Sequence, residues 1–320
     1  MQTPSPVRHI GVDIGKYEIV AACAEGHFSV RKIRNQRSAL TAFLKGLPAG
    51  SRIAVEATGG YHELLADLAH QRGFVVYVLN PKDTRHYAKA MGLRGKTDRV
   101  DAQLIARLLY REHEQLHPWI PPTPEQRQID QMLKRRAKLS RTQAALIQSL
   151  KDLDEFTPDL KSLKERLDKV IARIDEKVKT LTEANAERKQ HHTRLCSITG
   201  VGAVVGSSLL NTLERVPLKN ADAFVAFTGL DPRPKDSGQC RGRRRLSKRG
   251  PGELRRLLYM AAMAAAKTKA WKAFYEHQRD KGLSTTAALV VLARRIARTA
   301  WSIFTYKTEF DAGRMVVMLT

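Results

Sequence analysis

Four carboxylates are notable in a chain that is otherwise rich in positive charge. Asp98 and Asp101 lie three residues apart in a segment typical of a helix start, and Asp13 and Glu56 each end an apolar run upstream. So basic a protein has few reasons to gather four acids unless they hold metal ions. Mg²⁺ prefers oxygen ligands, and paired ions stabilise both the attacking and leaving oxygens of a phosphodiester. The four acids therefore predict a Mg²⁺ (or Mn²⁺) site for nuclease or strand-transfer chemistry.

The expected positions of these acids agree with this chemistry. Asp13 falls on a predicted central strand, Glu56 ends a neighbouring strand, and Asp98 and Asp101 share one helix face. Taken singly, Asp98 is as well explained as a helix cap and Asp101 as a surface acid. The Gly-x-Asp-x-Gly pattern around Asp13 also opens actin-like and sugar-kinase folds. The chain is short for two such domains, however, and has no second Asp-Gly-Gly phosphate loop.

A second segment with chemical potential is the cationic stretch 231–250, in which eight of twenty residues are Arg or Lys. Such a loop is suited to a phosphate backbone. Its basic residues are Arg233, Lys235, Arg241, Arg243, Arg244, Arg245, Lys248 and Arg249. Ser237 lies among them, where guanidinium groups can polarise a phosphodiester, although by itself a turn serine is the simpler interpretation. Ser247 is a weaker candidate, since it fits an N-cap of the following helix.

Composition indicates the kind of partner. The 320 residues include 56 Lys+Arg against 32 Asp+Glu, a formal charge of +24. This excess favours a nucleic-acid partner, with a merely soluble basic surface or a ribosome-associated protein as alternatives. Three cysteines without paired spacing suggest neither a disulfide framework nor a zinc site. We expect a cytoplasmic protein without a membrane segment, because no secretory signal or spanning apolar stretch is evident.

The chain divides into three predicted parts: residues 1–116, 117–190 and 191–320. Three successive short strands, then alternating helix and strand, is the order of a ribonuclease H-like α/β fold. Its predicted strands cover residues 7–12, 18–24, 27–33, 52–56 and 74–79, and its predicted helices cover residues 38–47, 61–72 and 97–112. A Pro-rich stretch, residues 117–124, marks the boundary to the second part.

The middle part has the apolar rhythm of two long coiled-coil helices separated by a break at residues 156–158. Arg136 and Gln143 occupy two positions of this rhythm that should be apolar, so the seam is imperfect. The apolar positions are Ile129, Met132, Leu139, Leu146, Leu150 and Leu153 in the first helix, and Leu160, Leu163, Leu167, Val170, Ile174 and Leu181 in the second. We expect this part to serve spacing or oligomerisation.

The last part is expected to be mainly helical. Gly200 and Gly202 form a Gly-x-Gly turn between apolar segments, similar to a helix-hairpin-helix element whose backbone N–H groups face a phosphate. A Gly-rich helix connection without a ligand is the alternative. Residues 253–306 read as wholly helical, and Arg294, Arg295 and Arg298 form a stripe facing solvent or nucleic acid.

These motifs together resemble the insertion sequence one-ten family of bacterial transposases, which includes the pilin-gene invertases. The motifs are Val12-Asp-Ile-Gly15, Val55-Glu-Ala-Thr-Gly-Gly-Tyr61, Lys96-Thr-Asp-Arg-Val-Asp-Ala102, Ile198-Thr-Gly-Val-Gly202, Phe227-Thr-Gly-Leu230, Ser237-Gly238 and Leu246-Ser-Lys-Arg-Gly250. The resemblance implies a RuvC-like metal site of Asp13, Glu56, Asp98 and Asp101. It also implies that Ser237 is the nucleophile that bonds covalently to DNA. The segment Gln239-Cys-Arg241 departs from the family, which is often Gly-rich there.

The resemblance further implies a structured non-coding guide RNA that pairs with donor and target DNA. The interpretation of this sequence is thus a DNA transposase or site-specific recombinase with a metal site and a serine nucleophile. A homo-oligomer, dimer or tetramer, is expected because exchange of four strand ends needs several protomers. The alternatives are a metal-dependent junction resolvase in which Ser237 is inert, and a non-catalytic RNA- or DNA-binding protein.

Overall fold

The computed structural model describes residues 7–26, 28–57, 59–93, 95, 97–233, 242 and 244–313. The chain forms two compact units, Met1–Pro121 and Pro122–Thr320, and each is described by itself. The two long helices of the middle part belong to the second unit. The three-part division proposed from the sequence stays a prediction.

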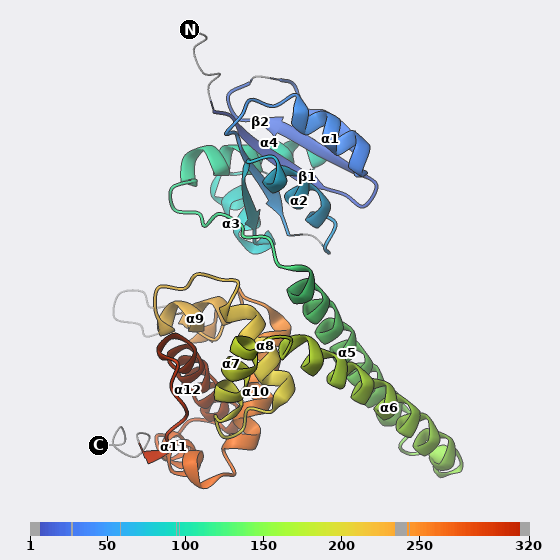
Figure 1. Cartoon of the computed structure of the whole chain (residues 1–320), viewed down its shortest axis with the longest axis vertical. Helices are drawn as coiled ribbons and strands as arrows, with labels where there is room; N and C mark the ends of the chain where they lie inside the picture. The colour runs from blue at the N-terminus through green and yellow to red at the C-terminus, as the bar shows by residue number, and fades with distance from the viewer. Residues whose placement is uncertain are drawn as a thin grey trace. The chain divides into compact units, whose positions relative to one another are not determined.

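The first unit is built on a five-stranded mixed sheet with the order β3-β2-β1-β4-β5. Figure 1 labels two of these strands, β1 and β2, and the helices α1 to α4. The strands are β1 (His9–Ile14), β2 (Glu18–Cys23), β3 (Arg31–Arg34), β4 (Arg52–Glu56) and β5 (Val75–Leu79). The strands β1, β2 and β3 pair antiparallel, whereas β4 runs parallel to both β1 and β5. This sheet confirms the mixed α/β class, and the ribonuclease H-like assignment stays a prediction.

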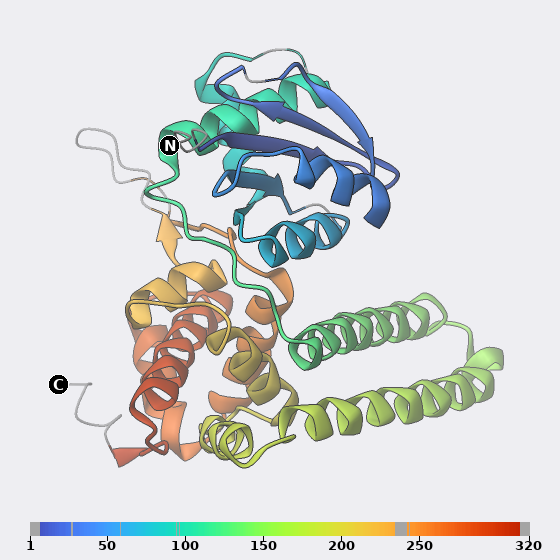
Figure 2. The same ribbon diagram turned by 45° about the horizontal axis from the view of Figure 1, so that its top comes forward.

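Different helices cover the two faces of the sheet (Figure 2). Alternate residues of β1 such as Ile10 and Val12 pack with α1 (Arg37–Lys45) and α2 (Glu63–Gln71). On the opposite face, strand residues pack with apolar residues of α4 (Asp98–Glu112). Since strand side chains alternate between faces, Gly11 and Asp13 lie on the α4 side of β1.

Gly11 sets how closely α4 approaches the sheet. A Cβ atom on Gly11 would lie 2.0 Å from the backbone nitrogen of Ala106 and 2.4 Å from the carbonyl oxygen of Ala102. Any larger residue would therefore overlap the α4 backbone. The glycine thus allows α4 to lie directly on β1, which brings the first turn of α4 near Asp13.

The helix α3 (Pro81–Ala90) is an element that the sequence analysis missed. The sequence analysis predicted a strand over residues 74–79 and no helix before residue 97, yet Asn80-Pro81 is a helix start. The Asn80 side chain accepts a hydrogen bond from the Lys82 backbone nitrogen, and Pro81 occupies the first turn. This helix contributes Thr84 to the candidate site described below.

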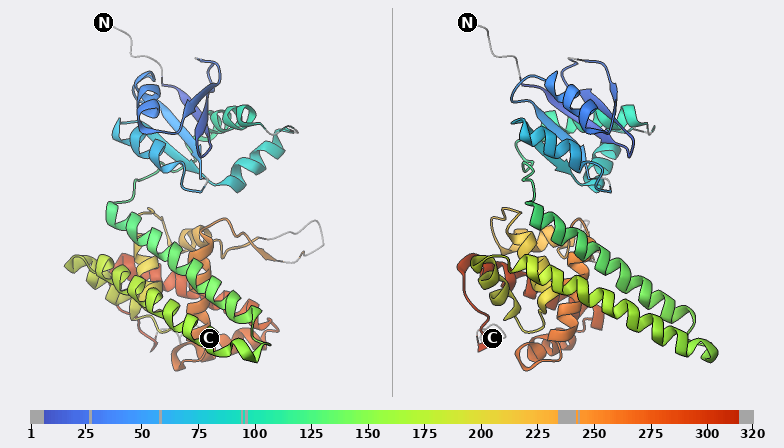
Figure 3. Two further views of the ribbon diagram at one scale, coloured as in Figure 1. Left: turned by 90° about the vertical axis from the view of Figure 1, so that its right-hand side faces the viewer. Right: turned by 45° about the vertical axis from the view of Figure 1, so that its right-hand side comes forward.

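The second unit begins with a helical hairpin formed by α5 (Pro124–Ser149) and α6 (Thr157–Thr182), which lie side by side in both views of Figure 3. The two polar interruptions of the apolar rhythm have partners across this hairpin. Arg136 pairs with Asp175 through two nitrogen–oxygen contacts of 2.5 and 3.0 Å, and the Gln143 amide donates to Asp168 at 2.7 Å. Cross-helix pairing therefore explains why the seam tolerates polar residues.

The remaining helices pack around one apolar core that includes the fully buried Trp271 and Phe224. They are α7 (Ala186–Cys196), α8 (Ala203–Leu213), α9 (Ala221–Thr228), α10 (Gly252–Ala265), α11 (Lys269–Asp280) and α12 (Thr285–Tyr306). The stretch expected to be wholly helical is interrupted twice, and Ser284 caps α12 through the Ala287 backbone nitrogen. No helix in the described residues is long and apolar enough to span a membrane.

Candidate functional site

The sheet brings Asp13 and Glu56 to neighbouring positions. Parallel pairing aligns Val12 of β1 with Val55 of β4, so the residues that follow them lie side by side at the same strand ends. Both carboxylates are half-buried, and both follow the strand alternation onto the face covered by α4. Two acids separated by 43 positions in the sequence thus share one edge of the sheet.

The helix α4 supplies the other two carboxylates. Asp98 and Asp101 lie in its first turn, with Asp98 exposed and Asp101 half-buried. The Thr97 hydroxyl accepts a hydrogen bond from the Val100 backbone nitrogen at 3.3 Å and caps the helix. The N-terminus of a helix carries partial positive charge, which stabilises acids placed there. Thr97, and not Asp98, is therefore the cap.

The four acids interact electrostatically at Asp13. Its pKa is raised from 3.8 to about 6, first by burial and then by the charges of Asp101, Asp98 and Glu56. A hydrogen bond from the backbone of Ile14 opposes this rise. The carboxyl end of β1 therefore carries more negative charge than its surroundings neutralise.

This arrangement has the chemistry of a divalent-cation site. Carboxylate oxygens are the ligands that Mg²⁺ and Mn²⁺ prefer, and a cation would relieve the repulsion at Asp13. Among the described residues, however, no three His, Cys, Asp or Glu side chains are already gathered as ligands of one ion. The donor set fits the metal, and binding requires the carboxylates to draw closer together.

Thr84 is a participant that the sequence analysis did not identify. Its hydroxyl lies 2.5 Å from Glu56 Oε2, and the side chain is 4 % exposed. This hydrogen bond fixes one carboxylate oxygen and leaves the other available to a ligand. The sequence signal that could have identified Thr84 is the Asn80-Pro81 helix start, which predicts α3 and places Thr84 in its first turn.

The base of the cationic segment is a short antiparallel pair, β6 (Pro232–Arg233) and β7 (Arg245–Leu246). Arg233 and Arg245 are both exposed and lie directly opposite each other. Like charges in this position repel unless an anion lies between them. Arg244, Lys248 and Arg249 are also exposed, while Ser237, Lys235, Arg241 and Arg243 lie outside the described residues.

Ser247 does not cap the following helix, and that prediction was wrong. The N-cap of α10 is Pro251, four residues further on. The Ser247 hydroxyl instead donates to Asp231 Oδ1, and its backbone nitrogen donates to the Asp231 carbonyl at 2.9 Å. With 8 % exposure, Ser247 serves to join the two ends of the cationic segment.

The turn between α7 and α8 contains Gly200 and Gly202. Gly200 has φ +96°, and its missing Cβ would lie 2.7 Å from the Ala261 carbonyl oxygen on α10. Backbone conformation and close packing therefore account for this glycine. Gly202 is the N-cap of α8 and has open space around its missing Cβ. A phosphate role for this turn stays a prediction.

A cluster of half-buried arginines lies on α12. Arg298 donates to Asp222 Oδ1 at 2.7 Å. Burial, followed by the charge of Arg298, lowers the pKa of both Arg294 and Arg295. The Arg294 Nε is buried and has no hydrogen-bond acceptor within the described part of the chain. Arg294 and Arg295 thus lie half-buried beside the like charge of Arg298, the reverse in sign of the carboxylates in the first unit.

Two transposase family models match this chain, one over the four carboxylates and the other over the cationic segment. Residues 10–158 match the DEDD transposase domain of IS110 elements, and residues 192–276 match the family described as "Transposase IS116/IS110/IS902 family". The first match includes all four carboxylates, and the second includes the cationic segment.

Several curated proteins are similar along most of their length. The pilin gene-inverting protein of Moraxella lacunata is 26% identical over 267 residues, covering 81% of each chain. The transposase of insertion element IS1328 from Yersinia enterocolitica is 27% identical, covering 94% of this chain and 98% of the relative. The transposase of IS1111A from Coxiella burnetii is 25% identical, covering 96% and 92%. With both family matches and this similarity along most of its length, the chain belongs to the IS110 family of insertion-sequence transposases.

Proposed function

We propose that this protein cuts and rejoins the DNA of an insertion sequence by combining the carboxylate site of the first unit with a serine nucleophile, Ser237. The observation that carries the proposal is that β1, β4 and the first turn of α4 bring four carboxylates close enough for Asp101, Asp98 and Glu56 to add to the effect of burial on Asp13, in a chain of net charge +24. Family membership supports DNA as the substrate.

In this proposal, Asp13, Glu56, Asp98 and Asp101 hold Mg²⁺ or Mn²⁺. When bound, such an ion supplies Lewis acidity to a phosphodiester oxygen. The β1 and β4 strands hold Asp13 and Glu56 in register, Thr84 orients the Glu56 carboxylate, and α4 presents the remaining pair. These residues bring hard oxygen ligands to one place from three separate elements.

The Ser237 assignment is supported by the sequence and by the family. In the proposed step, the Ser237 oxygen bonds to phosphorus while one bridging P–O bond breaks. The proton that leaves the serine is balanced by the proton that the departing sugar oxygen takes up. Exposed cations at the base of the segment, including Arg233 and Arg245, stabilise the charge on the phosphate. The covalent bond conserves the phosphodiester energy for rejoining.

The proposal extends to partners. A structured non-coding RNA that pairs with donor and target DNA is expected from the family, and a charge of +24 suits a protein that binds several polyanions. A homo-oligomer, dimer or tetramer, is proposed because four strand ends must be exchanged.

The decisive experiment assays recombination and covalent protein–DNA adducts that survive denaturation. Asp101→Asn and Ser237→Ala should each abolish recombination while binding nucleic acid normally, and Ser237→Ala should form no adduct. Ser247→Ala serves as a serine control and should still form the adduct. Full activity of Asp101→Asn, or in excess chelator, refutes the metal site. Cleavage by Ser237→Ala without any adduct would instead favour the junction-resolvase alternative.

A further inference from the structure

The second unit contains a pocket that neither proposed active site uses. Its volume is about 670 Å³, within the range of small-molecule sites. It is formed where the start of α5, the start of α7, the end of α8 and α12 meet. The side chains that matter are Gln126, Glu187, Arg188, His191, Glu214 and Phe304.

Three buried nitrogen atoms of the lining have no hydrogen-bond partner among the described residues. They are Nε and Nη2 of Arg188 and Nδ1 of His191, and of these Nε lies within ion-pair distance of Glu214. His191 is 7 % exposed as a whole. Leaving such a group unsatisfied is unfavourable, because it has lost its hydrogen bonds to water without replacing them. The unpaired guanidinium nitrogen indicates that the pocket takes a ligand with hydrogen-bond acceptors.

The acids of the pocket already have partners. Glu214 lies 3.3 Å from Arg188 Nε and accepts from Gln126 Nε2 at 3.2 Å. Glu187 Oε1 lies 3.7 Å from Lys307 Nζ. Glu125 also lines the pocket, and hydrogen bonds from its own backbone and from Thr123 lower its pKa. With three carboxylates around one arginine, an anionic ligand such as phosphate is disfavoured.

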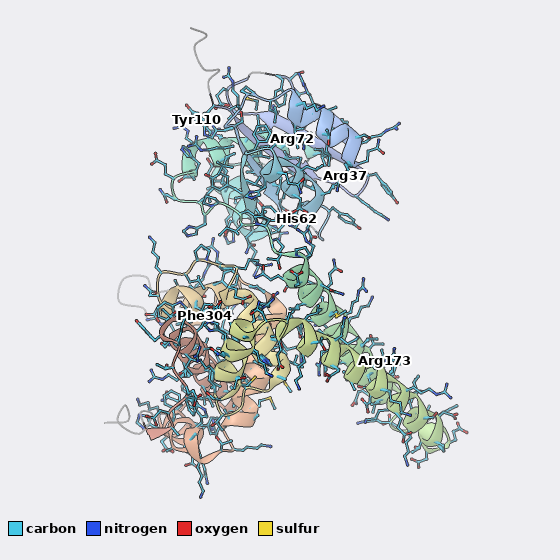
Figure 4. The ribbon with its side chains drawn as sticks, viewed as in Figure 1. Arg37, His62, Arg72, Tyr110, Arg173 and Phe304 are labelled. Atoms are coloured by element: carbon cyan, nitrogen blue, oxygen red, sulfur yellow. The ribbon has the colours of Figure 1, made fainter. Side chains whose placement is uncertain are left out.

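The pocket also has an aromatic wall. The rings of His191 and Phe304 lie 4.9 Å apart with their planes tilted by 41°. Phe304 is labelled in Figure 4 on α12. Flat ring faces of this kind stack with nucleobases, which is the usual way in which proteins hold unpaired bases. The ligand should therefore be flat, uncharged and rich in acceptors.

We propose that this pocket binds an unpaired guanine base of a single-stranded nucleic acid. Guanine presents two neighbouring acceptors, O6 and N7, which arginine can engage together, and Arg188 provides that group. Its opposite edge carries N–H donors, which suit the glutamates that surround Arg188. The other bases lack this combination of a paired acceptor edge and a paired donor edge.

The inference extends the proposed function to recognition of an unpaired base, and it is independent of the metal and of Ser237. Its test measures binding without recombination, so that either proposal can fail alone. Calorimetric titration of the full-length protein would compare guanosine, adenosine, cytidine and inorganic phosphate. Short uridine-rich and thymidine-rich oligonucleotides with one central guanine then separate RNA, DNA and the free nucleoside as sources.

The expected result is binding of guanosine and of the guanine-containing oligonucleotides, with weaker binding of the other nucleosides. Arg188→Gln should weaken guanosine binding by roughly tenfold to a hundredfold. Phe304→Leu should also weaken it, and keeps the test valid if Arg188→Gln fails to fold. The matched control is Arg173→Gln, because Arg173 is exposed on α6 and is labelled in Figure 4. Equal binding of all nucleosides, binding of phosphate alone, or unchanged affinity in both pocket variants would overturn the proposal.

Discussion

The two units of this protein both gather like charges, but of opposite sign. In the first unit, three neighbouring carboxylates and burial raise the pKa of Asp13 to about 6. In the second, burial and Arg298 lower the pKa of Arg294 and Arg295. A partner of opposite charge would relieve the repulsion within each cluster. The comparison teaches that the sign of the gathered charge indicates what each unit binds.

The clusters also differ in construction. The carboxylates come from two strands and a helix, held together by the close approach at Gly11 and by the Thr84 hydrogen bond. The arginines come from one helix, and Arg298 among them pairs with Asp222. A small cation requires converging ligands, whereas a polyanion needs only an extended surface.

Gly11→Ala should have the largest effect on stability and recombination, because it moves the four acids apart without removing any of them. The new methyl group would overlap the α4 backbone, so α4 must move away from β1. We expect destabilisation of about 3 kcal/mol or more and loss of recombination. Urea unfolding and the recombination assay measure the two effects. Gly46→Ala is the control, since its Cβ would meet nothing closer than 3.5 Å; equal behaviour of the two variants would contradict the explanation.

Thr84→Val should have the next largest effect, a loss of metal affinity or activity. The substitution keeps the shape of the side chain but removes the hydrogen bond to Glu56. Loss of such a supporting bond typically weakens metal affinity or activity by roughly tenfold to a hundredfold. Thr84→Ser should restore most of the loss, because it restores the hydroxyl. A Val variant with unchanged Mg²⁺ dependence would show that Glu56 needs no such support.

Arg294→Gln tests the opposite cluster. If Arg294 contacts a phosphate, its loss should weaken nucleic-acid binding severalfold and reduce the salt slope by about one. The measurement is affinity for a DNA duplex across a range of salt concentrations. Arg173→Gln on the hairpin provides a matched loss of charge. The same slope in both variants would mean that the α12 arginines face solvent.

Asp13→Asn should have the smallest effect on stability, and one of opposite sign. Because the folded-state pKa of Asp13 is about 6 rather than 3.8, stability falls as pH rises between these values. The Asn variant has no carboxyl group at this position, so its stability does not fall in this way as pH rises. Without metal at pH 7 it should melt higher by roughly 2–5 °C, and gain less from Mg²⁺. A lower Tm than that of the unmodified protein in chelator would exclude the repulsion.

Much of the fold of the first unit could be predicted from sequence patterns. Apolar runs ending in Asp13 and Glu56 identify their strands, and the Thr97 cap identifies the start of α4. That the two acids become neighbours follows only once β1 and β4 are known to pair in parallel. Periodicity within a segment carries no information about register between segments, so this step required the structure.

Other features could not be found from local pattern. Thr84 has no spacing relation to Glu56, and its helix lies between residues 79 and 97, where the sequence analysis predicted no element. Ser247 lies where a cap was plausible, yet its partner is Asp231, sixteen residues earlier in the chain. The guanine pocket combines residues from four helices, and only packing of the second unit brings them together.

The polar seam of the hairpin has a mechanical consequence. The Arg136–Asp175 and Gln143–Asp168 pairs are satisfied in one alignment of α5 and α6, and sliding one helix along the other would break both. Each helix has 26 residues, a length of about 39 Å. The hairpin is therefore a rigid spacer of fixed length. Whatever its tip contacts is held at a constant distance from the helices at its base.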